Sequence, residues 1–335
     1  QTYATSAGWT LSPGDATKIV YAQFRDLNLN VSATVSDTIV LDTVNPTLDF
    51  ATPNELTTAI QSSTSYTVAW SENGTGSPIV VRDLQRYVAP IPAPGSCTGG
   101  AFVEDGASSG AVSPVIVSGL VGGKCYVWIQ ILFDAAGNYA VGESGAVLVD
   151  TTAGAPSPPD VDATGGGVFQ PATNGTVFFR PSAASTITLD AWAADAESGL
   201  SYVRFQTLSG TGWTPTPALP NTDSGAPYTQ NVAFSGGPSS GSIQVLSRNN
   251  AGIDSAIRTV TLTADSSAPT ADFTTPDEPT TTSQPSDAVA VTWTESDGGG
   301  AGVASTSLLR QKATLSDSVC GAFADDPAFS AVPDP

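Results

Sequence analysis

Residues 45–55 read NPTLDFATPNE and lead on to YTVAWSE at 66–72. The same pair of phrases returns as APTADFTTPDE at 268–278 and VAVTWTE at 289–295. A pair of phrases that returns in this way indicates two closely related domains in one chain, and it therefore sets the fold problem as one of tandem modules.

A second recurring element gives the period of the array. A strand-like segment ends in an aspartate and then reaches a proline three times, at Asp42, Asp150 and Asp265. These aspartates lie 108 and 115 residues apart, which is the length of one β-sandwich domain. We therefore expect four parts: 1–45, the last strands of a domain; 46–152, a complete domain; 160–266, another; and 267–335, the first strands of a domain related to 46–152. Both ends are expected to fall inside a module of a longer protein.

The local pattern favours strands throughout. Val31, Val35, Ile39 and Leu41 alternate imperfectly with Ser, Thr and Asp, and clusters of Gly, Pro, Asn and Ser follow at short spacing. No segment keeps a helical period. We expect an all-β chain of tandem immunoglobulin-like or fibronectin III-like β-sandwich domains in an elongated array.

Composition excludes several classes of function. The formal net charge is −20 and only 13% of the 335 residues are charged, so the basic surface that a nucleic-acid partner requires is missing. The chain has no His and no Met, which removes the commonest general base and the commonest neutral metal ligand. No run of 18 apolar residues is present, so we expect no membrane insertion in this segment.

Residues 120–126, LVGGKCY, followed by an alternating run to Phe133 and by DAAGN at 134–138, resemble a strand pair of fibronectin III or bacterial Ig-like domains. In those families a tyrosine at the position of Tyr126 bonds back to the backbone. The resemblance also implies buried strand-B tryptophans at Trp70, Trp192 and Trp293. It extends over nearly the whole chain and points to the repeats of large bacterial surface and adhesin proteins. The turn at 134–138 becomes DLNLN at 26–30 and NNAGI at 249–253, which departs from a uniform motif.

The three cysteines predict a disulfide and a compartment. Cys97 lies in a Gly-rich and Pro-rich loop, and Cys125 precedes Tyr126. Cys320, in SVCGAF, matches Cys97 in SCTGGAF, so its partner is expected in the part of its domain that this chain lacks. We predict a Cys97–Cys125 disulfide and an oxidising, extracellular location. Two unpaired buried thiols stay an alternative.

Acidic residues gather at the predicted module ends. Hard oxygen ligands at such places could hold Ca²⁺ and stiffen the array. The alternative is that these side chains cap turns through hydrogen bonds to the backbone. The aspartates that we assign to candidate calcium sites are Asp26, Asp42, Asp134, Asp150 and Asp265.

Other chemical motifs are weak. Asp195 and Glu197 could be read as a glycosidase carboxylate pair, but the phrase AADAESGL that contains them resembles an Ig-like loop. Asn-x-Ser/Thr triplets at Asn30, Asn73 and Asn174 are common by chance in a chain rich in Ser and Thr. No nucleophile elbow, phosphate loop or metal cluster is present.

We therefore expect no enzyme, but a structural stalk or fibre segment of an extracellular surface protein, with neighbouring domains of the same longer protein as its partners. One alternative is an adhesin segment that binds a glycan or a host receptor through end loops, for which the stretch 209–228 with Trp213 and Tyr228 is the candidate. Another is a filament in which 267–335 of one copy and 1–45 of the next complete one module.

Overall fold

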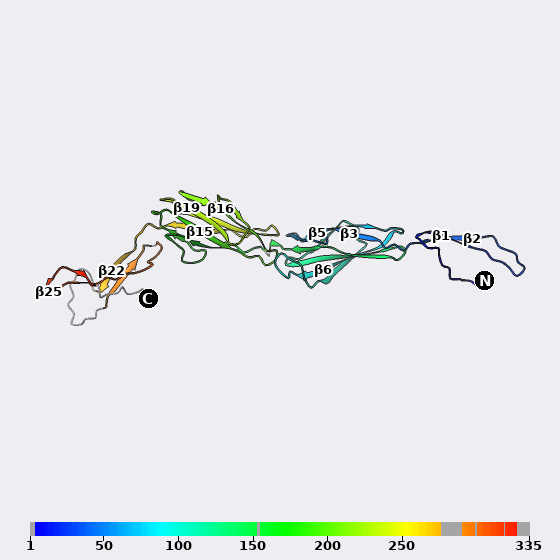
Figure 1. The fold of residues 1–335 in the computed structure, drawn as a ribbon, viewed down its shortest axis with the longest axis horizontal. Helices are drawn as coiled ribbons and strands as arrows, with labels where there is room; N and C mark the ends of the chain where they lie inside the picture. The colour runs from blue at the N-terminus through cyan, green and yellow to red at the C-terminus, as the bar shows by residue number, and fades with distance from the viewer. Residues whose placement is uncertain (1–3, 153–154, 276–289, 299, 318, 327–335) are drawn as a thin grey trace. The chain divides into compact units, whose positions relative to one another are not determined.

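The structure is a computed structural model and describes residues 4–152, 155–275, 290–298, 300–317 and 319–326. These residues form β-strands and connecting turns without any α-helix, so the fold class is all-β, as predicted (Figure 1). No described helix could cross a membrane. Residues group into two compact units, of which the first contains Gln1–Pro159, Ala193–Arg204 and Leu246–Ile257, and the second contains Asp160–Trp192, Phe205–Val245 and Arg258–Pro335. The domain boundaries stated above stay predictions.

Two sheets of the first unit pack as a β-sandwich. One has the order β3-β5-β8, and the other has the order β4-β11-β9-β6-β7, with β10 also pairing β9. Their core joins Phe50 and Trp70 of the first sheet to Tyr126 and Trp128 of the second. The strands are β3 Thr47–Thr52, β4 Thr58–Gln61, β5 Ser65–Asn73, β6 Ile79–Pro90, β7 Val103–Ser109, β8 Val115–Ser118, β9 Lys124–Asp134, β10 Tyr139–Glu143 and β11 Ala146–Val149.

The N-terminal strands of this unit form a separate pair. β1 (Ala16–Ala22) and β2 (Val35–Leu41) are antiparallel, with Ala16 opposite Leu41 and Ala22 opposite Val35. No third strand joins them among the described residues.

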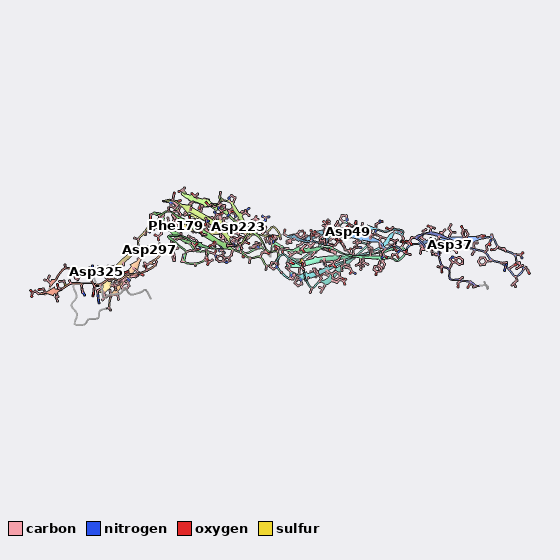
Figure 2. All side chains as sticks on the ribbon, in the orientation of Figure 1. Asp37, Asp49, Phe179, Asp223, Asp297 and Asp325 are labelled. Atoms are coloured by element: carbon pink, nitrogen blue, oxygen red, sulfur yellow. A yellow bond between two sulfur atoms is a disulfide. The ribbon has the colours of Figure 1, made fainter. Side chains whose placement is uncertain are left out.

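Two larger sheets follow, with the orders β12-β15-β19-β17 and β13-β14-β21-β20-β16-β18. In the second unit Phe179, which is labelled in Figure 2, contacts Trp213 edge-on, with ring centres 4.9 Å apart. The ring centre of Phe234 lies 5.3 Å from that of Phe179. The strands are β12 Asp160–Thr164, β13 Val168–Phe169, β14 Val177–Phe179, β15 Ser185–Trp192, β16 Leu200–Leu208, β17 Trp213–Thr216, β18 Asn221–Asp223, β19 Tyr228–Phe234, β20 Gly241–Asn249 and β21 Arg258–Ala264.

The repeated phrases form matching strand pairs. In β22 (Thr270–Thr275) Phe273 lies opposite Trp293 of β23 (Thr292–Ser296), as Phe50 lies opposite Trp70. Both pairs shift register directly after the phenylalanine, so the sequence repeat is also a structural repeat. The short strands β24 Gln311–Lys312, β25 Leu315–Ser316, β26 Val319–Cys320 and β27 Ala324–Asp325 follow.

The prediction that Trp70, Trp192 and Trp293 each form a core is correct only for Trp70, which is 5% exposed. Trp192 is 45% exposed because β15 directs Ile187, Leu189 and Ala191 inward, and the next residue in the strand faces the other way. Trp293 is 37% exposed in a two-stranded sheet. The remaining core prediction, Tyr126, is correct: Tyr126 is buried, and its hydroxyl accepts a hydrogen bond from Val121 N at 2.8 Å.

Candidate functional site

The phrase DAAGN folds into a five-residue turn that its own aspartate caps. Asp134 Oδ1 accepts hydrogen bonds from the backbone N–H groups of Ala136 and Asn138, and Asp134 Oδ2 accepts one from Asn138 Nδ2. Burial opposes ionisation of this carboxyl, but the hydrogen bonds from Asn138 and Ala136 outweigh it and hold the pKa of Asp134 below its usual value.

The turn at 26–30 has the same geometry although its sequence differs. Asp26 Oδ1 accepts from Asn28 N and Asn30 N, and Asp26 Oδ2 accepts from Asn30 Nδ2. The hydrogen bond from the Asn30 side chain, followed by that from the Asn30 backbone, lowers the pKa of Asp26. The turn at 249–253 keeps the backbone bonds, with Asn249 in place of the aspartate and Ile253 N donating to Asn249 Oδ1 at 2.8 Å. The apparent departure of the three motifs is therefore a departure in side chains only.

Sixteen residues separate the first residue of each turn from the strand-end aspartate that follows it, as from Asp26 to Asp42, from Asp134 to Asp150 and from Asn249 to Asp265. This spacing is visible in the sequence, and it could have identified the three turns as one motif. The hydrogen bonds show that Asp26 and Asp134 cap these turns. The strand-end aspartates instead accept hydrogen bonds from later loops: Asp42, Asp150 and Asp265.

Each strand-end aspartate contacts the loops that come after it in sequence. Asp42 is buried, and its Oδ2 accepts a hydrogen bond from the Ser77 hydroxyl at 2.6 Å. Asn138 Nδ2 donates to the backbone oxygen of Asp42 at 3.2 Å. Gly76 lies so close that a Cβ there would be 2.6 Å from the Asp42 carboxylate. We call this arrangement the Asp42 junction.

The Asp150 junction lies wholly in the first unit and is more acidic. Asp150 is fully buried, and its Oδ2 accepts hydrogen bonds from Ser198 N at 3.2 Å and Asn249 Nδ2 at 2.8 Å. The same amide lies 3.2 Å from Asp195 Oδ2. Asp195 Oδ1 accepts from the backbone of the loop that it caps, including Ser198 N at 2.8 Å. Glu197 completes this group of three carboxylates.

Burial of these carboxylates is incompletely compensated. Asp150 Oδ1 and Glu197 Oε2 are buried without a hydrogen-bond partner. Desolvation, followed by the contact with Asp150 and the charges of Asp150 and Asp195, raises the pKa of Glu197 to about 7. Desolvation also raises the pKa of Asp150. The group therefore favours a proton or a cation.

The Asp265 junction repeats the pattern in the second unit. Asp265 Oδ2 accepts a hydrogen bond from Ala301 N at 2.8 Å. A Cβ at Gly300 would lie 2.5 Å from Asp265 Oδ2 and 2.6 Å from Asp297 Oδ2, so these two carboxylates face one position. Asp297 Oδ2 also accepts from Gly302 N at 2.7 Å.

The five aspartates assigned to candidate calcium sites do not form one site. Asp42 and Asp134 lie near each other, since Asn138 Nδ2 donates to both, whereas Asp26, Asp150 and Asp265 contact other residues. No group of three or more His, Cys, Asp or Glu side chains in the described part of the chain is arranged to hold a metal ion. The oxygens of Asp26 and Asp134 already accept hydrogen bonds from their turns. Of the five, only Asp150 has a buried carboxylate oxygen without a donor among the described residues.

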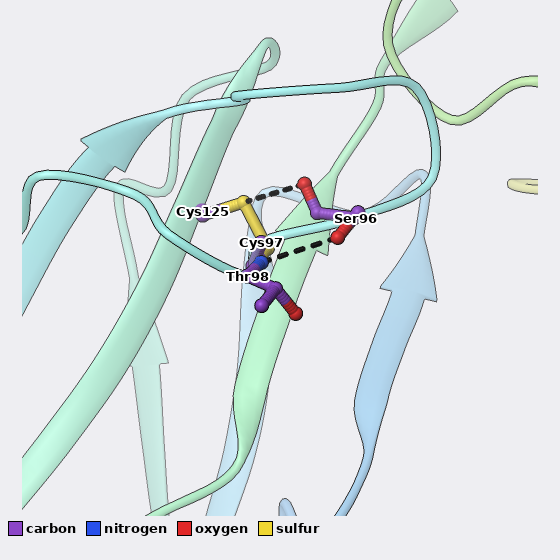
Figure 3. Close-up of a disulfide and its surroundings, with 4 residues drawn as sticks. All are labelled: Ser96, Cys97, Thr98 and Cys125. Atoms are coloured by element: carbon purple, nitrogen blue, oxygen red, sulfur yellow. Dashed lines mark hydrogen bonds between the residues drawn. A yellow bond between two sulfur atoms is a disulfide. The ribbon is translucent and has the colours of Figure 1, made fainter.

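Cys97 and Cys125 form the predicted disulfide, 28 residues apart (Figure 3). Both cysteines are buried and pack with Ala89 and Leu148 at one side of the sandwich. Closing a loop of this length stabilises the folded chain by ~3 kcal/mol in the chain-entropy model. Cys320 is exposed and is not in a disulfide.

Two other predicted sites, the stretch 209–228 and the pair Asp195 and Glu197, form different contacts from those expected. The stretch 209–228 contains strands β17 and β18, and Trp213 packs on Phe179 and Phe234 while its Nε1 donates to Ser239 O. Trp213 is therefore half-buried at the start of β17, where one side of its ring packs on Phe179 and Phe234. Asp195 and Glu197 belong to the Asp150 junction.

A cavity of about 200 Å³ opens at the β6–β7 edge. Two donors of residues that line it, Trp128 Nε1 and Arg86 Nε, have no partner among the described residues. The full lining is Leu84, Arg86, Gly106, Ala107, Ser108, Val117 and Trp128.

No protein family model matches the chain, and no curated protein matches it. Solved structures that it resembles include the fibronectin(III)-like modules of CbhA from Clostridium thermocellum, at 14% identity over 65% of this chain and 94% of that chain with a TM-score of 0.32. A Ca²⁺-stabilized adhesin that helps an Antarctic bacterium bind ice is 15% identical over 77% of this chain and 59% of that chain, with a TM-score of 0.30. The sialic acid binding region of a Streptococcus sanguinis adhesin is 13% identical over 69% of this chain and 81% of that chain, with a TM-score of 0.21.

Proposed function

We propose that the chain is a non-catalytic structural segment of an extracellular surface protein, which holds the functional domains of that protein apart. The observation that supports this proposal is the repeated junction. Asp42, Asp150 and Asp265 each end a strand, and each is hydrogen-bonded to a loop that follows it.

Such junctions resist bending for an electrostatic reason. Asp42 and Asp150 are buried, and a hinge motion that separated them from their donors would break hydrogen bonds to charged groups, each of which typically contributes ~2 kcal/mol. A chain whose successive modules are linked in this way transmits force and keeps its spacing. This is the property that a stalk needs.

The Cys97–Cys125 disulfide supports the extracellular assignment, because such bonds form and persist in oxidising compartments. We further propose that Ca²⁺ binds at the Asp150 junction, where carboxylate oxygens supply the hard ligands that this ion prefers. Asp150 Oδ1 and Glu197 Oε2, which are buried without a hydrogen-bond partner, would contribute oxygens to it. The ion would neutralise a group for which no basic partner is found among the described residues.

Small-angle X-ray scattering of the full chain tests the stalk function. In Ca²⁺, the Asp150→Ala chain is expected to sample a wider range of maximum dimensions than the wild type, because both hydrogen bonds to Asp150 are lost. Asp162→Ala is the control, since Asp162 in β12 is a half-buried aspartate outside the junctions. Identical scattering from the wild type and the Asp150→Ala chain would refute a stiffening role.

Calorimetric titration with CaCl₂ tests the ion separately. We expect a dissociation constant of about 10⁻⁴–10⁻³ M, as in other extracellular modules, and loss of the signal in Asp150→Asn. A wild-type chain that takes up no Ca²⁺ would refute the ion but not the stalk.

Glycan binding is the second candidate, and the β6–β7 cavity is the observation that favours it. Its apolar lining and the unpaired donors of Arg86 and Trp128 suit a small hydroxylated ligand. A glycan array probed with the wild type and with the cavity-filling Ala107→Leu chain decides this question: binding that Ala107→Leu abolishes supports the cavity as a binding site. The head-to-tail filament stays a prediction, and a monodisperse species of 33.9 kDa in light scattering would exclude it.

A further inference from the structure

The chain contains the tripeptide Asn-Gly-Thr twice, at 73–75 and at 174–176. Because the local sequences are identical, the intrinsic chemistry of the two asparagines is the same. Any difference in their reactivity must come from the fold. The two sites therefore form a matched pair within one molecule.

Asn174 is held at every group that could react. Its Oδ1 accepts a hydrogen bond from Val161 N at 2.8 Å, and its Nδ2 donates to Asp160 Oδ1 at 2.8 Å. The N–H of the next residue, Gly175, donates to Ala172 O at 2.8 Å. The side chain is half-buried. Rotation of this amide toward the Gly175 nitrogen would break all three hydrogen bonds.

Asn73 is exposed at the end of β5, where the chain leaves the sheet. Within the described residues, neither its side-chain amide nor the N–H of Gly74 makes a hydrogen bond. Gly74 has no Cβ, so nothing on that residue blocks the approach of its nitrogen to the Asn73 side chain.

We propose that Asn73 is a site of spontaneous deamidation in the folded protein. The Gly74 nitrogen loses its proton and attacks Asn73 Cγ, the Cγ–Nδ2 bond breaks, and ammonia leaves with that proton. A cyclic succinimide results. Water then opens either carbonyl of the ring and gives aspartate or isoaspartate at position 73.

The product matters because of where Asn73 lies. The loop reads Asn73-Gly74-Thr75-Gly76, and Gly76 lies against the Asp42 carboxylate. The related loop reads Asp297-Gly298 and reaches Gly300, which lies against both Asp265 and Asp297. Asn73 pairs with Thr47 as Ser296 pairs with Thr270, so Asn73 lies one strand position before the counterpart of Asp297. Deamidation therefore adds an acid at the start of the loop that carries Gly76 and Ser77 to Asp42. This consequence for ion binding, unlike the reaction itself, rests on the proposed function.

Peptide mapping by mass spectrometry tests the reaction. The full chain is incubated at mildly alkaline pH, folded or in guanidinium, and conversion of each asparagine is followed with time. In guanidinium both sites should convert at the same rate. In the folded chain Asn73 should convert at least ~10-fold faster than Asn174, a barrier difference of ~1.4 kcal/mol or more. Equal rates in the folded chain would overturn the proposal.

Asp160→Ala removes the acceptor of Asn174 Nδ2 and should accelerate conversion at Asn174 but not at Asn73. No acceleration at Asn174 would show that hydrogen bonding is not what separates the sites, which also contradicts the proposal. Calcium titration of Asn73→Asp addresses the consequence: tighter binding than in the wild type is expected. Unchanged binding would refute the gain at the Asp42 junction, whereas the conversion of Asn73 is judged from its mass spectrum alone.

Discussion

The Asp42 and Asp150 junctions use the same turn and the same strand-end aspartate but balance charge in opposite ways. At Asp42 a neutral hydroxyl, that of Ser77, donates to the carboxylate. At Asp150 a second and a third carboxylate, from Asp195 and Glu197, lie nearby, and one amide serves two of the three.

The difference begins at the first residue of each turn. Asp134 caps its turn and accepts hydrogen bonds from Ala136 and Asn138 within it, so an acid is stable there. Asn249 also accepts from its turn, but its Nδ2 faces Asp150 and Asp195, where an acid would have only repulsive neighbours. The same backbone thus carries different side chains around the strand-end aspartate: Asp134 lies near Asp42, whereas Asn249, Asp195 and Glu197 lie near Asp150.

Replacing Asn249 should have the largest effect on stability. Asn249→Asp turns the donor shared by Asp150 and Asp195 into another buried carboxylate, and we expect a loss of ~3 kcal/mol of unfolding free energy in EDTA at neutral pH. Chemical denaturation measures this loss, with Asn231→Asp as the control, because Asn231 is exposed and its Oδ1 only accepts from Thr188. A loss no greater than that of Asn231→Asp would contradict the account of the Asp150 junction.

The Asp42 junction should be broken by removing its hydroxyl. Ser77→Ala leaves the buried Asp42 Oδ2 without this donor, and a hydrogen bond to a charged group contributes ~2 kcal/mol. Ser71→Ala, on the exposed face of β5, is the matched control. If both variants unfold at the same denaturant concentration, the Ser77 contact does not stabilise the junction.

The two junctions should also separate by pH. The pKa of Glu197 is raised to about 7 in the folded chain, so its contribution to stability is present at acidic pH and is lost as pH rises through 7. Because the side chain is partly exposed, we expect a fall of only ~1.5 kcal/mol between about pH 5 and about pH 8 in EDTA. Glu197→Gln should flatten the curve. If the unfolding free energy of the wild type rose over this pH range instead, the result would contradict a proton held between Glu197 and Asp150.

The sequence predicted the all-β class because phrases such as NPTLDF and APTADF alternate and recur. It predicted the disulfide because Cys320 repeats the setting of Cys97. It failed at Trp192, where a strand-end indole resembled Trp70 but fell on the outer face, since one residue reverses direction in a strand.

The junctions were only half visible in the sequence. Strand-end aspartates mark the period, but hydrogen bonds such as Asn249 Nδ2 to Asp150 Oδ2 join residues 99 apart. No local pattern encodes such a contact. The choice between turn capping and calcium had no single answer either, because Asp26 and Asp134 cap turns whereas Asp150 keeps an unpaired oxygen.

The smallest predicted effect tests whether the two junctions truly share a backbone. Gly137 and Gly252 hold the fourth position of their turns at φ of 92° and 84°, and Leu29 occupies the equivalent position at 71°. A side chain is therefore tolerated in this turn, but at the usual cost of left-handed backbone. Gly137→Ala and Gly252→Ala should each lower the unfolding free energy by ~1 kcal/mol.

The space around the two glycines does not favour either substitution over the other. Nothing lies within 4 Å of a Cβ at Gly137, and only an Arg248 nitrogen lies 3.5 Å from a Cβ at Gly252. Equal losses in denaturation would place the whole difference between the junctions in their side chains, and a loss at one glycine alone would show that the turns themselves differ.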